Sequence, residues 1–251
     1  MAGQVRVDGQ VVIKPATAVP QDIRLDLEAG PRFASRGGEK LEGALTRFAF
    51  QIESRVCADV GCSTGGFTDC LLQHGAAKVY AIDVGKGILH WKLRTDPRVV
   101  AMEETNARYV EKLPEPVSLV TIDASFISLK ILLPVVRGWF DPSDSPHSGG
   151  INGEADGSVI ALIKPQFEAG RKETAKGEGV IRDPAVHQAV LKDVLTFAQK
   201  EGFNLQGLIK SPLTGPKGNI EFLAWLEVGQ KGDVDMNDVA NLINSIEFMN
   251  G

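Results

Sequence analysis

Residues 59–66 read Asp-Val-Gly-Cys-Ser-Thr-Gly-Gly, and they directly follow the apolar run Val56-Cys57-Ala58. This order predicts a β-strand that ends in a glycine-rich loop, with a helix beginning where the loop ends. In a doubly wound α/β sheet such a loop holds a nucleotide-like ligand, because glycine lets the backbone approach the ligand and the first helical turn offers amide groups. The stretch therefore predicts an α/β fold with a ligand site at the carboxyl end of this strand.

The glycine spacing and two acidic residues indicate which ligand is bound. The spacing Gly61-x-x-x-Gly65-Gly66 departs from the Gly-x-Gly-x-x-Gly that binds a dinucleotide pyrophosphate, which disfavours phosphate. Asp59 introduces the loop and suits a ligand with a positive end, such as the amino group and sulfonium of S-adenosylmethionine. The next predicted strand, 78–82, ends at Asp83, where an acidic residue typically accepts hydrogen bonds from the two hydroxyls of an adenosine ribose. These features favour S-adenosylmethionine as the cofactor.

The same loop also fits a second motif. Gly61-Cys62-Ser63-Thr64-Gly65 matches the Gly-x-Ser-x-Gly nucleophile elbow of serine hydrolases. A hydrolase of that type needs an acid and then a histidine after the serine, and of the four histidines only His187 lies late enough in the chain. Because His187 opens a polar helical stretch, the hydrolase is the weaker hypothesis, and a lack of labelling by a fluorophosphonate probe would exclude it.

The composition is that of an ordinary globular protein, with 251 residues, of which 43% are hydrophobic and 24% charged. The net charge of −5 argues against a surface that follows a phosphate backbone throughout, so any contact with nucleic acid is expected to be local. No apolar stretch approaches the roughly 18 residues typical of a membrane helix, and the N-terminus is polar, which predicts a cytoplasmic protein.

Basic residues are clustered in three parts of the sequence. The basic clusters are Arg32, Arg36 and Lys40; Lys86, Lys92, Arg94 and Arg98; and Arg171, Lys172, Lys176 and Arg182. Taken singly, each is best explained by solvated loop charges.

The chain has three cysteines, Cys57, Cys62 and Cys70. They are odd in number and lack Cys-x-x-Cys spacing, so we expect reduced, structural cysteines and neither a disulfide nor a metal site.

Apolar runs alternate with amphipathic stretches along most of the chain, which is typical of a parallel α/β sheet. Strands are predicted at 56–60, 78–82, 99–102, 117–122, 158–163, 203–210 and 219–227. Helices are predicted near 66–74, 88–94, 128–137 and 184–200, after an earlier one that contains Lys40, Leu41, Ala44, Leu45 and Phe48. The last two strands are joined by the hairpin-like connection 211–218. The predicted sheet therefore has seven strands, mostly parallel, with one antiparallel strand at its edge.

The N-terminal residues have a different pattern. Residues 5–12 predict two short strands joined by an Asp8-Gly9 turn, and residues 23–27 predict a third strand. So short a segment cannot bury a core alone. We therefore divide the chain into an N-terminal element at 1–29, a linker at 30–36 and a main domain at 37–251.

Two further segments of the main domain have distinct compositions. Residues 141–157 are rich in Asp, Pro, Ser, Gly and Asn, which predicts a flexible surface insertion. Near the C-terminus, apolar residues at helical spacing predict an amphipathic helix that covers the core. These residues are Val239, Leu242, Ile243 and Ile246.

Charged residues lie where predicted strands stop or start. Asp123 and Lys164 each follow an apolar strand, and Glu221 begins the antiparallel one, so all three are expected at the carboxyl edge of the sheet. Lys40, on the helix before the first long strand, could join them. Each alone is best explained as a solvated strand-end charge, but four of them beside a sulfonium-binding loop indicate catalysis. Methyl transfer from a sulfonium is an in-line displacement, and a lysine among carboxylates could take or guide the proton that an alcohol nucleophile loses.

With these residues in place, the chain resembles the TlyA or hemolysin-A family of ribosomal RNA 2'-O-ribose methyltransferases, related to the FtsJ/RrmJ group. The match runs from about Ser35 to Leu226. Its phrases are Ser-Arg-Gly-Gly-Glu-Lys-Leu at 35–41, Asp-Val-Gly-Cys-Ser-Thr-Gly-Gly-Phe-Thr-Asp at 59–69, Thr-Ile-Asp-Ala-Ser-Phe-Ile-Ser-Leu at 121–129, Ile-Lys-Pro-Gln-Phe-Glu at 163–168 and Gly-Asn-Ile-Glu-Phe at 218–222. The resemblance implies a Rossmann-like S-adenosylmethionine-dependent methyltransferase fold. It also implies a Lys-Asp-Lys-Glu tetrad in which Lys164 is the central, proton-handling lysine. The tetrad consists of Lys40, Asp123, Lys164 and Glu221.

The resemblance further implies which residues bind S-adenosylmethionine. They are Asp59, Gly61, Ser63, Thr64, Gly65, Gly66 and Phe67 in the loop, Asp83 on the ribose and Asn106 at the adenine edge. For Asn106 a helix cap is an equally good explanation. The family's substrates are cytidines of ribosomal RNA, reached by opening the local RNA so that the ribose enters the site. The expected partners are therefore ribosomal RNA or ribosomal subunits, and neither DNA nor a membrane.

The front of the sequence departs from the family, whose members usually carry a complete small RNA-binding domain there. Residues 1–29 correspond only to the closing strands of that domain, so we expect them to be its remnant, with a weaker hold on RNA. Two functions follow: a ribosomal RNA 2'-O-methyltransferase, which the complete tetrad favours, or an RNA- or ribosome-binding module with weak or no turnover. Membrane lysis, which the older family name suggests, has no support from an apolar span or a strongly amphipathic basic helix.

Overall fold

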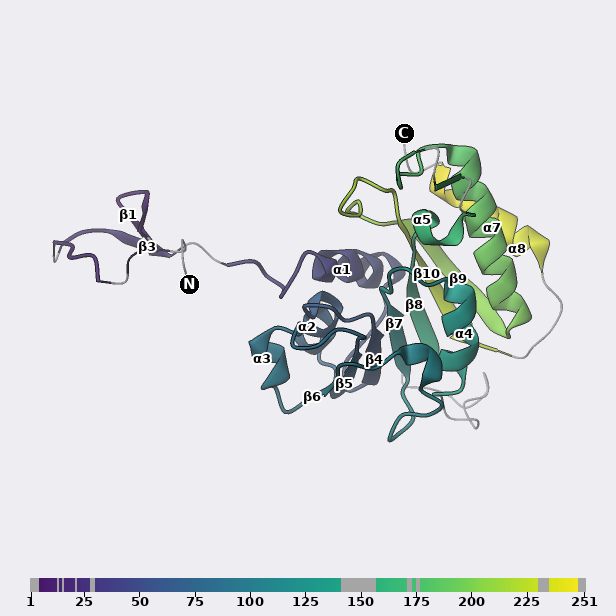
Figure 1. The fold of residues 1–251 in the computed structure, drawn as a ribbon, viewed down its shortest axis with the longest axis horizontal. Coiled ribbons are helices and arrows are strands. Elements are labelled where there is room, and N and C mark those ends of the chain that lie inside the picture. Colours follow the sequence, from purple (N-terminus) through teal and green to yellow (C-terminus); the bar gives the residue numbers. More distant parts are fainter. Residues whose placement is uncertain are drawn as a thin grey trace.

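The computed structural model describes residues 5–12, 14, 16–20, 22–27, 30–140, 157–170, 173–174, 177–229 and 235–247. Most of them belong to a seven-stranded sheet with helices on both faces, and the first of them form a separate three-stranded sheet (Figure 1). The insertion predicted at 141–157 lies outside the described residues, apart from the buried Gly157.

The seven-stranded sheet has the strand order β6-β5-β4-β7-β8-β10-β9. Its strands are β4 (Val56–Val60), β5 (Lys78–Ile82), β6 (Val99–Met102), β7 (Leu119–Ile122), β8 (Ser158–Ile163), β9 (Phe203–Lys210) and β10 (Phe222–Val228). Each neighbouring pair from β6 to β8 is parallel. The strand order reverses between β4 and β7, which is where doubly wound sheets bind ligands. The prediction of a mostly parallel, seven-stranded α/β sheet is confirmed.

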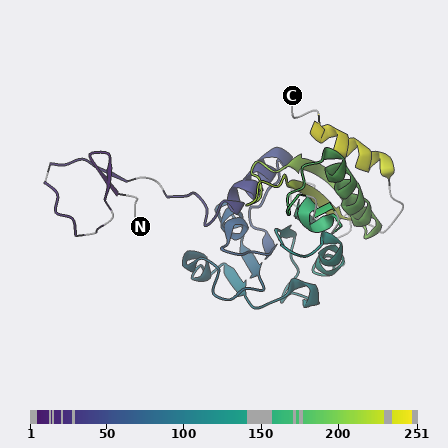
Figure 2. The same cartoon turned by 45° about the horizontal axis from the view of Figure 1, so that its top comes forward.

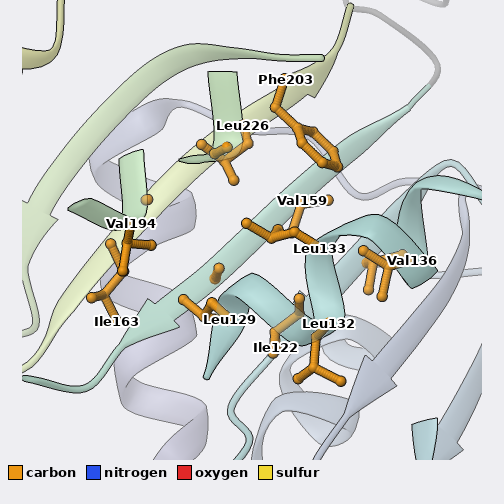
Figure 3. Packing of buried hydrophobic residues seen from close by; sticks show 14 of the residues in the cluster. Ile122, Leu129, Leu132, Leu133, Val136, Val159, Ile163, Val194, Phe203 and Leu226 are labelled. Carbon is orange, nitrogen blue, oxygen red and sulfur yellow. The ribbon is translucent and has the colours of Figure 1, made fainter. Parts of the chain in front are cut away.

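Helices cover both faces of this sheet, and successive strand residues point to opposite faces. The helices are α1 (Gly37–Phe48), α2 (Gly66–Gln73), α3 (Trp91–Arg94), α4 (Leu129–Arg137), α5 (Pro165–Glu168), α7 (Pro184–Lys200) and α8 (Met236–Glu247). On one face, α4, α7 and α8 bury residues such as Leu132 and Val194 against Val159 of β8 (Figure 3). On the other face, α1, α2 and α3 pack on Cys57 and Leu119. Burial on both faces explains why the strands read as continuous apolar runs.

The antiparallel strand does not lie at the edge of the sheet, where the sequence predicts it. β10 pairs antiparallel with both β8 and β9, so it lies inside the sheet and β9 forms the edge. After β8, the chain passes through α7 and forms β9 one position away from β8, which leaves a gap between the two strands. The hairpin after β9 then places β10 in that gap, where it pairs with both β8 and β9. A hairpin connection makes two strands neighbours, but it does not determine which of them is the outer one.

The N-terminal strands form a small sheet of their own. β1 (Val5–Val7), β2 (Gln10–Val12) and β3 (Leu25–Leu27) pair antiparallel in the order β2-β1-β3. Asp8 and Gly9 have φ of 47° and 81°, as a tight hairpin turn requires, so the predicted hairpin and third strand are confirmed. In both views this sheet stands away from the seven-stranded one (Figures 1 and 2).

Three predictions from composition and patterning can be compared with the structure. Cys57, Cys62 and Cys70 are buried and free of disulfides, as expected, and burial raises the pKa of all three thiols. α8 covers the core with the predicted apolar residues, of which Val239, Ile243 and Ile246 are buried and Leu242 is partly buried. Across the described residues, no helix has the length and apolar character needed to cross a membrane.

Candidate active site

The glycine-rich loop after β4 lies against the chain that follows β7. Gly61 has φ of 81°. A Cβ atom at this position would lie 2.8 Å from the carbonyl oxygen of Asp123 and 2.9 Å from Cα of Ala124, so only glycine fits. The ends of two central strands are therefore brought together at the carboxyl edge of the sheet.

A pocket of about 470 Å³ opens at this edge, and we refer to it as the first pocket. Its walls come from the start of α1, the glycine loop, the loop after β7, the end of β8 and the β9–β10 connection. All four residues of the predicted tetrad line it: Lys40, Asp123, Lys164 and Glu221. Residues that are far apart in the sequence are thus gathered around one hollow.

Lys164 is held by the loop after β7. It is 7% exposed, and its Nζ lies 2.6 Å from Oδ1 of Asp123. The same amine donates to Oγ of Ser125 at 3.1 Å and to the carbonyl oxygen of Asp123 at 3.3 Å. A nearly buried amine is therefore fixed by one carboxylate and one hydroxyl beside an open pocket, an arrangement suited to proton transfer.

Lys40 and Glu221 form a second ion pair. Nζ of Lys40 lies 2.6 Å from Oε2 of Glu221, which is 1% exposed. Glu221 immediately precedes β10, and because β10 runs antiparallel to β8, its start reaches the carboxyl edge of the parallel strands. The four charged residues are thus arranged as two pairs rather than as one mutually bonded cluster.

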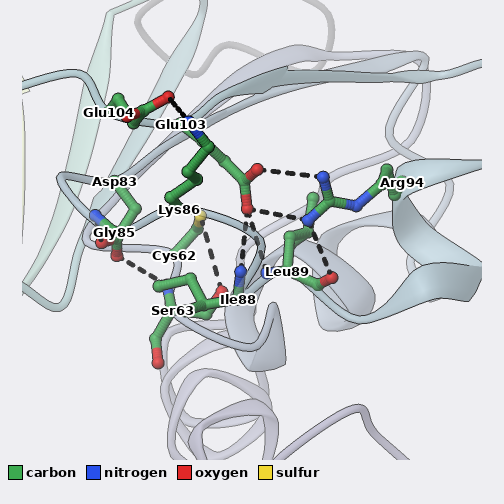
Figure 4. A network of polar contacts seen from close by, with 10 residues as sticks. All are labelled: Cys62, Ser63, Asp83, Gly85, Lys86, Ile88, Leu89, Arg94, Glu103 and Glu104. Atoms are coloured by element: carbon green, nitrogen blue, oxygen red, sulfur yellow. Dashed lines mark hydrogen bonds and ion pairs between the residues drawn. The ribbon is translucent and has the colours of Figure 1, made fainter.

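A second pocket, of about 310 Å³, adjoins the first. The two pockets share Gly61, Ser63, Asp123 and Ser125. In the second pocket, Asp83 accepts hydrogen bonds from the backbone amides of Ser63 and Gly85, both at 2.8 Å (Figure 4). A carboxylate has about four acceptor positions, so Asp83 retains capacity to accept from ligand hydroxyls.

A charged network fixes one wall of the second pocket. Glu103 accepts from the Arg94 guanidinium at 2.9 and 3.0 Å and from the backbone amides of Ile88 and Leu89 (Figure 4). The hydrogen bonds from Arg94 lower the pKa of Glu103 to about 2, so the carboxylate is ionised at neutral pH. Ile88 lines the pocket, and the hydrogen bond from its backbone amide to Glu103 fixes its position.

An aromatic pair lies on the side of Lys164 that faces a groove of about 710 Å³. Phe126 is 90% exposed and has φ of 63°, which is unusual for a bulky residue. Its ring centroid lies 4.9 Å from that of Phe167, and Nζ of Lys164 lies 5.8 Å from the Phe167 centroid. An aromatic face is therefore presented to solvent close to the buried lysine.

Comparisons with known proteins agree with this geometry. Residues 33–228 match the family described as FtsJ-like methyltransferase. The 16S/23S rRNA (cytidine-2'-O)-methyltransferase TlyA of Mycobacterium tuberculosis is 43% identical over 229 residues, which cover 90% of this chain and 80% of that protein. The chain belongs to the TlyA group of FtsJ-like methyltransferases. S-adenosylmethionine is therefore the expected cofactor of this TlyA-group chain.

Solved structures support the same assignment. A protein from Streptococcus thermophilus, described as a putative hemolysin, is 40% identical to this TlyA-group chain, with a TM-score of 0.75 over 97% of this chain and 86% of the other. An S-adenosylmethionine dependent methyltransferase from Mesorhizobium loti is 12% identical, with a TM-score of 0.51 over 75% of this chain and 97% of the other. At that identity the likeness shows the fold alone. The Rossmann-like methyltransferase fold is confirmed.

In this TlyA-group chain, most of the predicted cofactor residues line one of the two pockets. Thr64, Gly66 and Phe67 line the first pocket, and Asp83 and Asn106 line the second. Asn106 also caps a short 3-10 helix, η1 (Ala107–Tyr109), because its Oδ1 accepts from the backbone amide of Arg108 at 3.2 Å. Asn106 can therefore both cap this helix and lie beside a ligand in the second pocket.

Asp59 and Gly65 line neither pocket. Asp59 is fully buried within β4, and its side chain points to the sheet face that α2 covers, where it accepts from Oγ1 of Thr68 at 2.7 Å and Oγ1 of Thr121 at 3.1 Å. Burial raises its pKa to about 7. Its partners in the structure are two buried threonines of the fold rather than groups that line a pocket. Gly65 has φ of 94°, which favours glycine, and a Cβ atom there would also lie 2.2 Å from Cδ1 of Leu93 on α3, whose side chain would have to shift.

Sequence reasoning missed two polar residues that contact the tetrad. Ser125 follows Asp123 by two positions, and Gln166 follows Lys164 by two positions, each inside a phrase of the TlyA family. Their place in those phrases was the signal that could have identified them as site residues. The contact between Gln166 and Glu221 spans 55 positions, which no local pattern predicts.

Proposed function

We propose that this chain transfers the methyl group of S-adenosylmethionine to the 2'-oxygen of a ribose in ribosomal RNA, with cytidine as the modified nucleoside. The observation that carries the proposal is the position of Lys164, whose partners Asp123 and Ser125 lie where the two pockets adjoin. The substrate class comes from the TlyA relative, whose name specifies ribosomal RNA and the cytidine 2'-oxygen.

The second pocket is suited to the adenosine part of the cofactor. Asp83 has acceptor capacity for the ribose hydroxyls, and Asn106 lies where it can contact the adenine edge. The glycine loop lines both pockets and allows the methionine part of the cofactor to approach the backbone closely. When bound, S-adenosylmethionine supplies an electrophilic methyl group. The residues common to both pockets then border the place where this donor and the acceptor meet.

The first pocket is suited to the acceptor ribose. As its hydroxyl attacks in line, the hydroxyl must lose a proton, and Lys164 is the group that takes or guides that proton. Asp123 and Ser125 fix the direction of the lysine amine. The pair of Lys40 and Glu221 lines the same pocket and orients the ribose. The two lysines of the tetrad balance its two carboxylates, and Arg36 adds a positive charge to the lining, so the pocket does not repel a polyanion.

Other features support RNA as the acceptor. The exposed ring of Phe126 can stack on the base of a displaced nucleotide, as aromatic residues do in RNA-binding sites. Arg36 lines the first pocket, where a phosphate of the same strand would pass. By contrast, Lys86, Lys92 and Arg94 already bind carboxylates at 3.0, 2.6 and 2.9 Å.

The separate N-terminal sheet has a place in the same proposal. Residues 1–29 form an element that adds contacts to the RNA, residues 30–36 link it to the site, and residues 37–251 form the catalytic domain. A ribosomal RNA substrate is met in the cytoplasm, where ribosomes are assembled.

The test is transfer of labelled methyl from S-adenosylmethionine to ribosomal subunits that lack the modification, followed by nuclease mapping. We expect the wild-type chain to label a ribose 2'-oxygen, and Lys164→Ala to lose at least about 100-fold in rate, because the attacking hydroxyl would lose the group that takes or guides its proton. Cofactor binding, measured by calorimetry, should be unchanged. Lys192→Ala, at an exposed position on α7, is the matched control.

Two results would count against this proposal. Full activity in Lys164→Ala would contradict the tetrad assignment. Cofactor binding without any transfer by the wild-type chain would instead favour an RNA- or ribosome-binding module.

A further inference from the structure

Gln166 lies on α5, two residues after Lys164, and contacts the other ion pair of the site. Its Nε2 donates to Oε1 of Glu221 at 3.0 Å, while Nζ of Lys40 lies 2.6 Å from Oε2 of the same carboxylate. Glu221 is 1% exposed, so these donors replace the water that an exposed carboxylate would bind. Each oxygen of Glu221 thus has one donor, and the two donors come from different elements.

The orientation of the Gln166 amide follows from this contact. A carboxylate only accepts hydrogen bonds, so the NH2 group faces Glu221 and Oε1 faces away. Oε1 is buried and has no hydrogen-bond partner within the part of the chain that the structure describes. A buried acceptor without a partner is unfavourable, so packing alone does not explain an amide at this position, whereas the bond to Glu221 does.

The carboxylate of Glu221 is also confined by the backbone. A Cβ atom at Gly215, in the β9–β10 connection, would lie 2.6 Å from Oε1 of Glu221. Glu221 lines the first pocket, and Gln166 lines the groove beside Phe126. Their hydrogen bond is therefore part of the wall between these two hollows, and without it Oε1 of Glu221 would lose its donor and the carboxylate would be less firmly oriented toward Lys40.

We infer that Gln166 is a positioning residue for methyl transfer, which holds Glu221 in the orientation that fixes Lys40. The inference rests on the proposed function, because that function gives the Lys40–Glu221 pair a role at the acceptor ribose. Gln166 acts through Glu221 and contacts no reacting atom itself. The charged groups around this contact are Lys40 from α1, Lys164 at the end of β8, Asp123 from the loop after β7, and Glu178 on the groove.

Two substitutions test this role, because only one of them is expected to respond to pH. Gln166→Leu removes the donor at every pH, and we expect it to lower the rate of methyl transfer about tenfold, the effect of one hydrogen bond to a charged group. Gln166→Glu is nearly isosteric but donates only when protonated, because two facing carboxylates repel each other. We expect it to approach the wild-type rate near pH 6 and to fall below Gln166→Leu near pH 9.

Cofactor affinity provides the second readout. Gln166 does not line the second pocket, so calorimetric dissociation constants for S-adenosylmethionine should match the wild-type value in both variants, which also shows that they are folded. Equal losses in the two variants at every pH would overturn the inference, as would a wild-type rate in Gln166→Leu. Both results leave the proposed function standing if the wild type is active and Lys164→Ala is not. If the wild type transfers no methyl, the proposed function fails and the inference fails with it.

Discussion

Asp59 is a buried carboxyl whose protonation changes near neutral pH. Burial raises its pKa to about 7 from an ordinary value of 3.8. Between these values the folded protein holds a proton that the unfolded chain has released, so raising the pH through this range favours unfolding. Asn cannot ionise and can still hydrogen-bond to Thr68 and Thr121. We therefore expect the free energy of unfolding of wild type to fall, relative to Asp59→Asn, by roughly 1–4 kcal/mol between about pH 5 and pH 8.

Chemical denaturation of both proteins at the two pH values measures this difference. Asp22→Asn, which removes an exposed carboxyl from the N-terminal segment, is the control and should follow the wild type. If all three proteins show the same change of stability with pH, then Asp59 is ionised throughout and the assigned pKa is incorrect.

Among the structural elements, the junction between the ends of β4 and β7 depends on the close approach at Gly61. A Cβ atom there would meet backbone atoms of the loop after β7, in addition to the strain of φ at 81°. Gly87 has φ of 67° but open space around its Cα, so Gly87→Ala carries only the conformational cost of about 1–2 kcal/mol. We expect Gly61→Ala to destabilise the fold more than this and to weaken binding of S-adenosylmethionine, since Gly61 lines both pockets.

Equilibrium unfolding and calorimetric titration with the cofactor test this pair of variants. Equal effects of Gly61→Ala and Gly87→Ala on stability, with unchanged cofactor affinity, would show that the loop after β7 moves away easily and that the junction does not depend on glycine.

The elements were predictable from sequence to the extent that their signals are local. The parallel strands appear as apolar runs because both of their faces are buried, and the glycine loop and strand-end charges mark the carboxyl edge. The position of β10 inside the sheet depends on which side of β9 the hairpin docks, which no local pattern encodes. The structural role of Asp59 and the bond from Gln166 to Glu221 depend on side chains from elements that meet only in the fold.

The assembly of the two sheets leads to a prediction about the N-terminal residues. Within the described residues, the two core clusters around the seven-stranded sheet begin at Phe33, which is 3% exposed, and the amide of Ala34 donates to Asp69 of α2 at 2.7 Å. The small sheet contributes to neither cluster. A chain lacking residues 1–29 should therefore keep the thermal midpoint and cofactor affinity of the full chain. A chain lacking residues 1–36 should have a lower thermal midpoint and a weaker cofactor affinity, because Phe33 and the bond to Asp69 are removed.

Methyl transfer to ribosomal subunits separates the roles of these two segments. If residues 1–29 add contacts to RNA, the shorter deletion lowers transfer mainly at higher salt, because the remaining contacts with phosphates are fewer and are screened. Its rate at low salt should remain closer to that of the full chain. A loss of cofactor binding on removal of residues 1–29 would contradict this division, since it would mean that the small sheet supports the glycine loop directly. An unchanged rate at all salt concentrations would instead assign RNA binding to the catalytic domain alone, with Arg36 and Phe126 as its nearest contacts.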